Sequence, residues 1–270
     1  MNIKKNEDVL LRVEQLTVCY DGEPVVQDIS FQVKKGEILG IVGESGSGKS
    51  TVAKAVMGLL GNRAEVTGQV WYKGENLTAM PEKILRKYRG PELGMVFQDC
   101  KSALCPVRTV GAQMYEAVSE HEKVSRAEVE NRAAVLMKKI GLTDCARVLG
   151  SYPFELSGGM NQRVGICTAM LLKPDLLLAD EPTSALDVTV QKQVVEELLL
   201  MKKEFHTAML LITHNIGVVR KMADRILVLQ NGKVMDYGDT QKILENPESQ
   251  YTRQLMDSVI RLKRRENQKL

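Results

Sequence analysis

The sequence has little of several features that would each indicate a particular class of protein. Aromatic residues make up 4% of its 270 positions. No apolar run approaches the ~20 residues that a membrane-spanning helix needs. The five cysteines form no CxxC pair and no disulfide-like spacing, so we expect reduced thiols and a cytosolic protein. The first residues lead into charged positions, and we expect no signal peptide. Any role in a membrane process is therefore expected to be exercised from the membrane surface.

An excess of charge of one sign is also missing. Lys and Arg number 37 against 34 Asp and Glu, a formal net charge of +3. Nucleic-acid-binding proteins usually concentrate basic residues in a stripe or patch. The densest basic run here lies at 261–265, which we interpret as a solvated tail, with contact to a membrane surface as the alternative. We therefore expect no nucleic-acid partner.

Hydrophobic patterning predicts an α/β chain. Two alternating stretches near the start, each broken by a turn, predict an antiparallel β-subdomain. Farther along, short apolar strands alternate with helical runs, which implies a mostly parallel sheet. The expected strand stretches are 10–33 with a turn at Asp21-Gly22, 37–42, 65–77 with a turn at Lys73-Gly74, 176–179, 208–213, and a hairpin at 226–237 that turns at Asn231-Gly232.

The helical part of the pattern is concentrated between about 109 and 172. A helix is expected at 124–140, where Ser125 three residues before Glu128 predicts a capping box. We interpret 109–172 as a helical subdomain inserted in a single domain spanning 1–270. Further helices are expected at 50–60 and 189–205, and residues 246–270 are expected to form a C-terminal tail that becomes helical from about 249.

A glycine-rich loop is expected between the strand at 37–42 and the helix at 50–60. It matches the pattern G-x-x-x-x-G-K-[ST] of phosphate-binding loops, in which glycines let backbone N–H groups converge on a phosphate. Lys49 would reach the β- and γ-phosphates and the Ser50 hydroxyl would bind Mg²⁺. A chance Gly/Ser turn is the weaker alternative, because a strand precedes the loop and a helix follows it. The predicted nucleotide-binding residues here are Gly43, Glu44, Ser45, Gly46, Ser47, Gly48, Lys49, Ser50 and Thr51.

Two acids, Asp180 and Glu181, follow the apolar strand at 176–179. In P-loop enzymes an Asp at this place holds Mg²⁺, and a neighbouring acid can act as general base toward water. Two acids after a strand more often simply begin a loop. On a chain that also carries a phosphate loop, the catalytic interpretation is favoured.

Residues 156–163 read Leu-Ser-Gly-Gly-Met-Asn-Gln-Arg and resemble the signature motif of the ABC ATPases. A plain helix cap would explain Ser157 but not the position of the motif just before the two acids. The resemblance covers nearly the whole chain, with every motif in the family's order. It implies a P-loop NTPase core with a mostly parallel sheet, an N-terminal antiparallel β-subdomain, an inserted helical subdomain, and hydrolysis of ATP with Mg²⁺.

The resemblance also implies roles for single residues. Tyr20 is similar to the aromatic residue that stacks on adenine, and Gln98 to the glutamine that contacts Mg²⁺ and water and links the site to membrane subunits. His214 resembles the histidine that contacts the γ-phosphate. His121 and His206 match nothing and are expected at the surface. The expected catalytic residues are Lys49, Gln98, Glu181 and His214, and the expected Mg²⁺ ligands are Ser50, Gln98 and Asp180.

In the family the signature motif acts on the nucleotide of a partner subunit. Ser157, Gly158 and Gly159 are therefore expected to act in trans, together with Asp187 in a loop that crosses the dimer interface. Such a site is complete only in a dimer.

Three segments resemble the dipeptide, oligopeptide and nickel importer branch of the family: 97–111, 180–189 and the tail at 246–255. The branch implies a second, related ATPase subunit, two transmembrane permease subunits and an extracytoplasmic substrate-binding protein, with this chain on the inner face of the cell membrane. Longer peptide-importing relatives carry a cysteine-rich extension after the tail. Its absence here favours the nickel or metal-complex members.

The chain departs from the branch at three positions. Cys100 stands where Pro is usual, Cys105 where Asn is usual, and Asn161 where Arg is commoner. We interpret the two cysteines as ordinary loop thiols rather than metal ligands.

Three other functions remain as alternatives: an exporter ATPase, a regulatory nucleotide-binding module that does not turn over ATP, and a non-transport ABC ATPase. The importer-like segments argue against the exporter, and the presence of Glu181 and His214 argues against the regulatory module. A non-transport member usually has a long coiled-coil insertion or a second set of motifs, and the sequence has neither.

Overall fold

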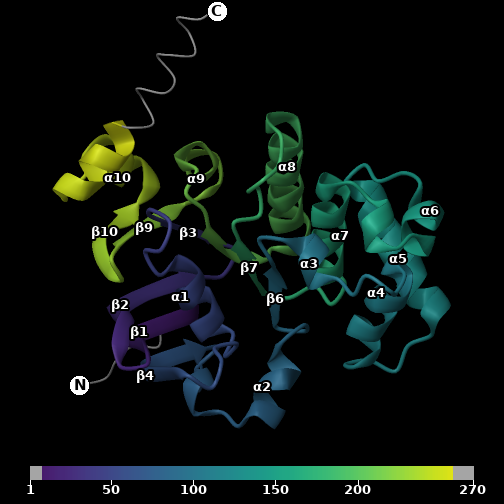
Figure 1. Cartoon of the computed structure of the whole chain (residues 1–270), viewed down its shortest axis with the longest axis horizontal. Coiled ribbons are helices and arrows are strands. Elements are labelled where there is room, and N and C mark those ends of the chain that lie inside the picture. Colours follow the sequence, from purple (N-terminus) through teal and green to yellow (C-terminus); the bar gives the residue numbers. More distant parts are fainter. Residues whose placement is uncertain (1–7, 258–270) are drawn as a thin grey trace, which may run out of the picture. The chain divides into compact units, whose positions relative to one another are not determined.

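The computed structural model describes residues 8–257, which form two compact units (Figure 1). The first consists of the described residues up to Met80 together with those from Met209 onward, and the second is Pro81–Ala208. The single-domain organisation with a subdomain at 109–172 stays a prediction.

The antiparallel sheet of the first unit consists of β1 (Val9–Tyr20), β2 (Glu23–Lys34), β4 (Ala64–Tyr72) and β5 (Glu75–Asn76). Its strand order is β2-β1-β4-β5. The turns fall at Asp21-Gly22 and Lys73-Gly74, and all four of these residues have positive φ. Alternate β1 side chains such as Leu11 and Val13 are buried, as the alternation in the sequence predicts. The predicted β-subdomain is confirmed.

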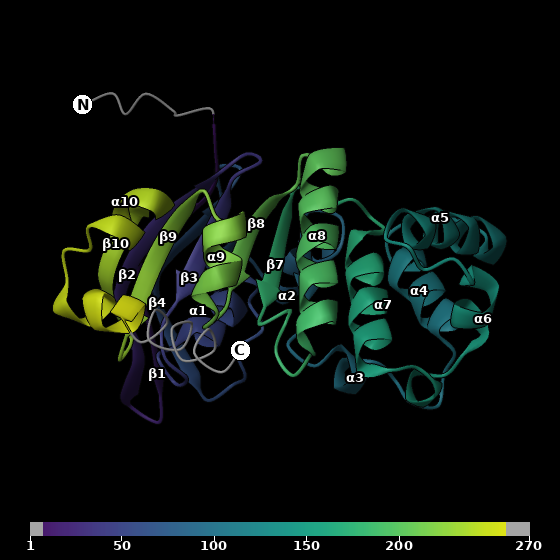
Figure 2. The ribbon, with the colours of Figure 1, turned by 90° about the horizontal axis from the view of Figure 1, so that it is seen from above.

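The other strands of this unit are β3 (Ile38–Val42), β8 (Ala208–Ile212), β9 (Arg225–Gln230) and β10 (Lys233–Asp239). β3 pairs in parallel with β8 and with β9, while β9 and β10 form the antiparallel hairpin predicted at Asn231-Gly232. Figure 2 shows α9 (Ile216–Met222) lying over these strands. The unit also contains α1 (Lys49–Val56), the short η1 (Leu77–Ala79) and α10 (Thr240–Glu245).

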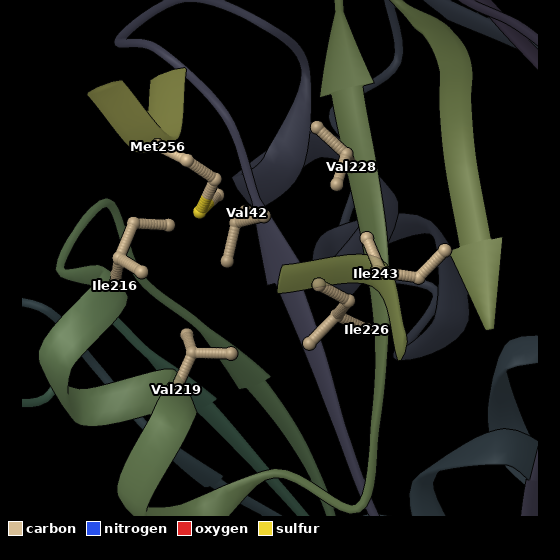
Figure 3. Packing of buried hydrophobic residues seen from close by; sticks show 7 residues of the cluster. All are labelled: Val42, Ile216, Val219, Ile226, Val228, Ile243 and Met256. Atoms are coloured by element: carbon tan, nitrogen blue, oxygen red, sulfur yellow. The ribbon is translucent and has the colours of Figure 1, made fainter. Parts of the chain in front are cut away.

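One apolar cluster ties the end of β3 to the C-terminal part of the described chain. Side chains from β3, α9, β9, α10 and the segment after α10 point toward one another in Figure 3. Burying such side chains contributes roughly 1.5–3 kcal/mol each. The cluster therefore fixes the tail beside the strand that leads into the phosphate loop. Its members are Val42, Ile216, Val219, Ile226, Val228, Ile243 and Met256.

The second unit contains a parallel pair of strands, β6 (Leu93–Val96) and β7 (Leu176–Asp180), and most of the helices. In Figure 1 the helices α4, α5, α6 and α7 gather in teal, and α8 runs beside α7. The helices are α2 (Glu82–Tyr88), α3 (Cys100–Ala103), α4 (Val110–Ser119), α5 (Arg126–Lys139), α6 (Cys145–Gly150), η2 (Pro153–Glu155), α7 (Gly158–Met170) and α8 (Val188–Phe205).

Two local predictions need correction. α1 ends at Val56 instead of near 60, because the chain turns out of the helix at Gly58, whose φ is +62°. Only half of the predicted capping box forms: the Ser125 hydroxyl accepts from the Glu128 N–H, but the Glu128 carboxylate pairs with Arg132.

The tail is helical from Gln250 to Asp257, and the basic run at 261–265 lies outside the described residues. Within 8–257, no helix combines the length and the apolar character that crossing a membrane requires.

Candidate functional site

The loop at 43–50 has a backbone that only glycine permits at two positions. A Cβ on Gly43 would lie 2.2 Å from the carbonyl oxygen of Leu229. Gly48 has φ +96°, and a Cβ there would lie 2.9 Å from the carbonyl oxygen of Val25. The loop is therefore pressed against neighbouring backbone, and α1 starts directly after it. Its N-terminus adds a partial positive charge to the loop.

Lys49 is buried within this loop, with 6% of its surface exposed. Its Nζ donates to the carbonyl oxygens of Gly43 at 2.9 Å and Glu44 at 2.6 Å. The ammonium group is thus held over the first two residues of the loop. The hydroxyl of Ser47 is buried and has no hydrogen-bond partner among the described residues.

The first unit also carries Tyr20 and His214. Tyr20 is the last residue of β1 and is half-buried. His214 is exposed. The residue before it, Thr213, donates its N–H to the carbonyl oxygen of Ile41 in β3, and the residue after it, Asn215, caps α9. The structure therefore places His214 beyond the end of β8, the strand next to β3.

Asp180 and Glu181 lie together in the second unit, at the end of β7. Both are almost completely buried, with 5% and 8% exposed. Glu181 has φ +48°, a left-handed conformation that is uncommon outside glycine and costs of order 1–3 kcal/mol. The N–H and the hydroxyl of Ser184 both donate to the Glu181 carbonyl, each at 3.0 Å, and hold it there. Strain of this kind clusters at functional sites.

Gln98 lies in the exposed loop between β6 and α3. The loop is attached to α7, because Gln162 Nε2 donates to the carbonyl oxygen of Phe97 at 3.2 Å. The thiol of Cys100 donates to the same carbonyl at 3.4 Å.

The signature-like segment forms the N-terminus of α7. Ser157 is the N-cap, and its hydroxyl accepts from the Met160 N–H at 3.2 Å. Ser157 and Gly158 are exposed, whereas a Cβ on Gly159 would lie 2.7 Å from a methyl group of Val190 in α8. Asp187 is exposed and caps α8 by accepting from the Val190 N–H at 3.0 Å. An exposed helix N-terminus with polar caps can accept an anion.

Three contacts around these segments could not be found by reasoning from the sequence. The buried Asn161 side chain donates to the carbonyls of Pro153, Leu156 and Ser157, and so secures the turn that precedes α7. Arg163 forms an ion pair with Glu197, and Tyr251 contacts the phosphate loop. Asn161, Arg163 and Tyr251 each lie in a segment that the sequence analysis identified, but the sequence does not show which residues they contact.

Cys100 is buried and Cys105 is half-buried, and both are free thiols. Within residues 8–257, no cluster of three or more His, Cys, Asp or Glu side chains is arranged to hold a metal ion. Cys100 is the first residue of α3 and not a loop residue as the sequence analysis predicted.

Comparisons with known proteins give the family. The family model described as ABC transporter matches residues 26–184. The metal-staphylopine import system ATP-binding protein CntD of Staphylococcus aureus is 42% identical over 92% of this chain and 93% of its own length. The oligopeptide transport ATP-binding protein OppD of Salmonella typhimurium is 40% identical over 94% of this chain and 77% of its own.

Solved structures agree. A dimeric ATP-binding cassette in a post-hydrolysis state with ADP and Pi has a TM-score of 0.76 at 28% identity, covering 86% of this chain and 99% of its own. CbiO1 of Clostridium perfringens, part of an ABC transporter complex, also has a TM-score of 0.76, at 27% identity, covering 90% and 93%. The predicted fold class is confirmed. The chain belongs to the ABC transporter family and is one of its ATP-binding proteins, which are ATP hydrolases.

Proposed function

We propose that this chain hydrolyses ATP to drive an importer of metal–chelator complexes, with di- and oligopeptides as the second candidate substrate class. The observation that carries the nucleotide part of the proposal is the loop at 43–50. There Gly43 and Gly48 occupy positions that no other residue fits, and the Lys49 ammonium group is held inside the loop. The unpartnered Ser47 hydroxyl adds a polar group suited to a phosphate ligand.

We propose the following roles for the site residues. Lys49 and His214 neutralise the γ-phosphate, and Tyr20 stacks on adenine. Glu181 acts as general base toward the attacking water, with Gln98 beside it. Phosphoryl transfer demands little covalent work from a protein, so these roles are positioning and stabilisation of charge. The strained backbone at Glu181 supports a functional role for that residue.

Mg²⁺ fits the donors that the chain offers. It prefers hard oxygen ligands, and it is commonly held by one or two protein oxygens together with substrate phosphates and water. The Ser50 hydroxyl and the buried Asp180 carboxylate are such oxygens, and we propose them as ligands together with Gln98. The ion would supply positive charge to the phosphate oxygens.

We propose that Ser157, Gly158, Gly159 and Asp187 act on a nucleotide held by a second ATPase subunit. The importer-like segments favour a related chain, rather than a second copy, as this partner. The exposed N-terminus of α7 supports this role. Two transmembrane permease subunits and an extracytoplasmic substrate-binding protein would complete the importer, with this chain bound to the inner face of the membrane.

The substrate proposal rests on the relatives. CntD is named for metal-staphylopine import and is 42% identical to this chain, which favours a metal complex. OppD is named for oligopeptide transport, which supports peptides as the second candidate.

Glu181→Gln tests the catalytic part. The amide keeps the shape of the side chain but cannot accept a proton, so we expect the ATPase rate of the assembled transporter to fall by roughly 10²–10⁴-fold. ATP binding should be retained, and uptake of a radiolabelled metal–chelator complex by cells should stop. Glu120→Gln, at an exposed carboxylate of the same unit, is the matched control and should behave as wild type. A wild-type ATPase rate in Glu181→Gln would refute the proposed base.

The same uptake assay tests the substrate class. Peptide uptake without metal uptake by the wild type would select the second substrate class.

A further inference from the structure

The C-terminal tail reaches the phosphate loop through one tyrosine. Tyr251 lies in the helical segment 250–257, and its hydroxyl oxygen accepts a hydrogen bond from the Glu44 N–H at 3.2 Å. These residues are 207 positions apart in sequence. Glu44 is the second residue of the loop, so the tail contacts the loop where it leaves β3.

The tail is fixed independently of this contact. The buried carboxylate of Asp236 in β10 accepts from the N–H groups of Glu248 and Ser249, and so holds the residues directly before the tail helix. Burial raises the pKa of Asp236, but hydrogen bonds from Thr252 and Ser249 outweigh it, and the pKa lies below its usual value. At neutral pH this anchor is therefore an ionised carboxylate.

The same segment is anchored at its other end by apolar packing. Met256 belongs to the buried cluster that includes Val42, the last residue of β3 (Figure 3). The ring of Tyr251 packs against this cluster. The apolar cluster thus fixes the ring in a position where its hydroxyl group reaches the phosphate loop.

Glu44 is held from two directions. Its N–H donates to Tyr251, and its carbonyl oxygen accepts from Lys49 Nζ at 2.6 Å. The bond to Tyr251 ties a backbone donor of the loop to the tail helix. A loop that is ordered before its ligand arrives loses less conformational entropy on binding.

We propose that Tyr251 is a positioning residue for the phosphate loop: by fixing Glu44, it preorders the loop and strengthens nucleotide binding. The inference rests on the proposed function of this loop as the ATP phosphate site. It gives the tail a role in the nucleotide site without any contact between Tyr251 and the nucleotide.

Tyr251→Phe tests the proposal, because it removes the hydroxyl and keeps the ring in the cluster. We expect the dissociation constant for ATP of the full-length chain, measured by titration calorimetry, to rise by about two- to tenfold, the range for one net hydrogen bond. In the assembled transporter, the KM for ATP should rise while kcat stays close to wild type. Hydrogen exchange of the peptide that contains Glu44 should become faster without nucleotide.

Tyr237→Phe is the matched control. Tyr237 also bonds to backbone through its hydroxyl, accepting from the Gln32 N–H at 3.0 Å and donating to the Gln32 carbonyl at 3.2 Å. Neither group belongs to the phosphate loop, so ATP binding should not change. A general loss of structure would affect both variants and their thermal unfolding alike.

The outcomes separate this inference from the proposed function. If the wild type binds ATP and Tyr251→Phe binds it as tightly or more tightly, the positioning role is wrong and the proposed function stands. Equal weakening in Tyr251→Phe and Tyr237→Phe would also overturn it, because the effect would then be structural. A wild-type chain that does not bind ATP overturns both.

Discussion

Gly165 lies within α7, where a neighbouring thiol occupies the space that a side chain would need. A Cβ on Gly165 would lie 2.3 Å from Cys100 Sγ and 3.0 Å from Cys100 Cβ. Burial raises the pKa of Cys100 to about 12, so the thiol is neutral and packs as a small apolar group. This contact joins α3, directly after the Gln98 loop, to the signature helix.

Gly165→Ala should therefore destabilise the protein. In an open helix position the change would stabilise by about 1 kcal/mol, but overpacking costs roughly 1–3 kcal/mol. We expect a net loss of about 1 kcal/mol in the free energy of unfolding, measured by urea denaturation. Cys100→Ala should remove part of this loss in the double variant. Gly150→Ala in α6, where a Cβ meets nothing within 4 Å, is the control. An equal effect of Gly165→Ala with and without the thiol would exclude the contact as its cause.

For single residues, the sequence predicts position along the fold better than backbone conformation or contacts. The motif pattern correctly placed Asp180 and Glu181 at the end of a buried strand, because a run of apolar residues before two acids has few other interpretations. It could not indicate the positive φ of Glu181, which depends on hydrogen bonds from Ser184. Nor could it indicate the contact between Cys100 and Gly165, because pairs distant in sequence meet only through the fold.

At the scale of elements, Arg163 joins α5, α7 and α8 through one ion pair and one hydrogen bond. Arg163 Nε in α7 lies 2.5 Å from Glu197 Oε1 in α8, and Arg163 also donates to the carbonyl of Ile140 at the end of α5. The second oxygen of Glu197 is buried and finds no hydrogen-bond partner in the described chain. Burial outweighs the attraction of Arg163 and raises the pKa of Glu197 to about 7.

This pair should make stability depend on pH. Between the ordinary Glu value of about 4.3 and about 7, the folded state binds a proton at Glu197 that the unfolded state has lost. The contribution of Glu197 to stability is therefore fully present below this window, and it is lost as pH rises through it. We expect Glu197→Gln, which has no ionisable group, to flatten the change in urea midpoint between pH 5 and pH 7.5.

The control for this dependence is Glu204→Gln on the same helix. Glu204 is exposed and pairs with Lys139, and that ion pair holds its pKa below the ordinary value. It should be ionised throughout the range and leave the slope unchanged. If Glu197→Gln kept the wild-type slope, the pH dependence would have to arise at another group.

The elements themselves were largely predictable. Alternation and helical spacing gave the strands of the β-subdomain and the helices α5 and α8 to within a few residues, because each buries one periodic face. The end of α1 and the second half of the Ser125 box were predicted wrongly. Hydrophobic periodicity does not show either cause. The chain leaves α1 at Gly58, and Arg132 binds the Glu128 carboxylate that the capping box would need.

At the scale of the whole molecule, the predicted motifs divide between the two units. The phosphate loop, Tyr20 and His214 belong to the first, and Gln98, the two acids and the signature segment belong to the second. Composition gives no indication of partner subunits, and their prediction rests only on the family resemblance and on the relatives.

The proposed action of the signature helix on a partner's nucleotide can be tested with Ser157→Asp. Aspartate caps a helix as well as serine does, so α7 should stay folded and ATP binding by the isolated chain should equal wild type. A carboxylate facing the γ-phosphate of the partner's nucleotide would repel it, and like charges in contact cost several kcal/mol. We therefore expect ATP-driven association with the second ATPase chain, measured by light scattering in a Glu181→Gln background, to weaken by more than about tenfold. Ser125→Asp, the same change at the cap of α5, should leave association intact. Undiminished association in Ser157→Asp would mean that this helix tip meets no phosphate, since a repelled nucleotide could not hold the two chains together.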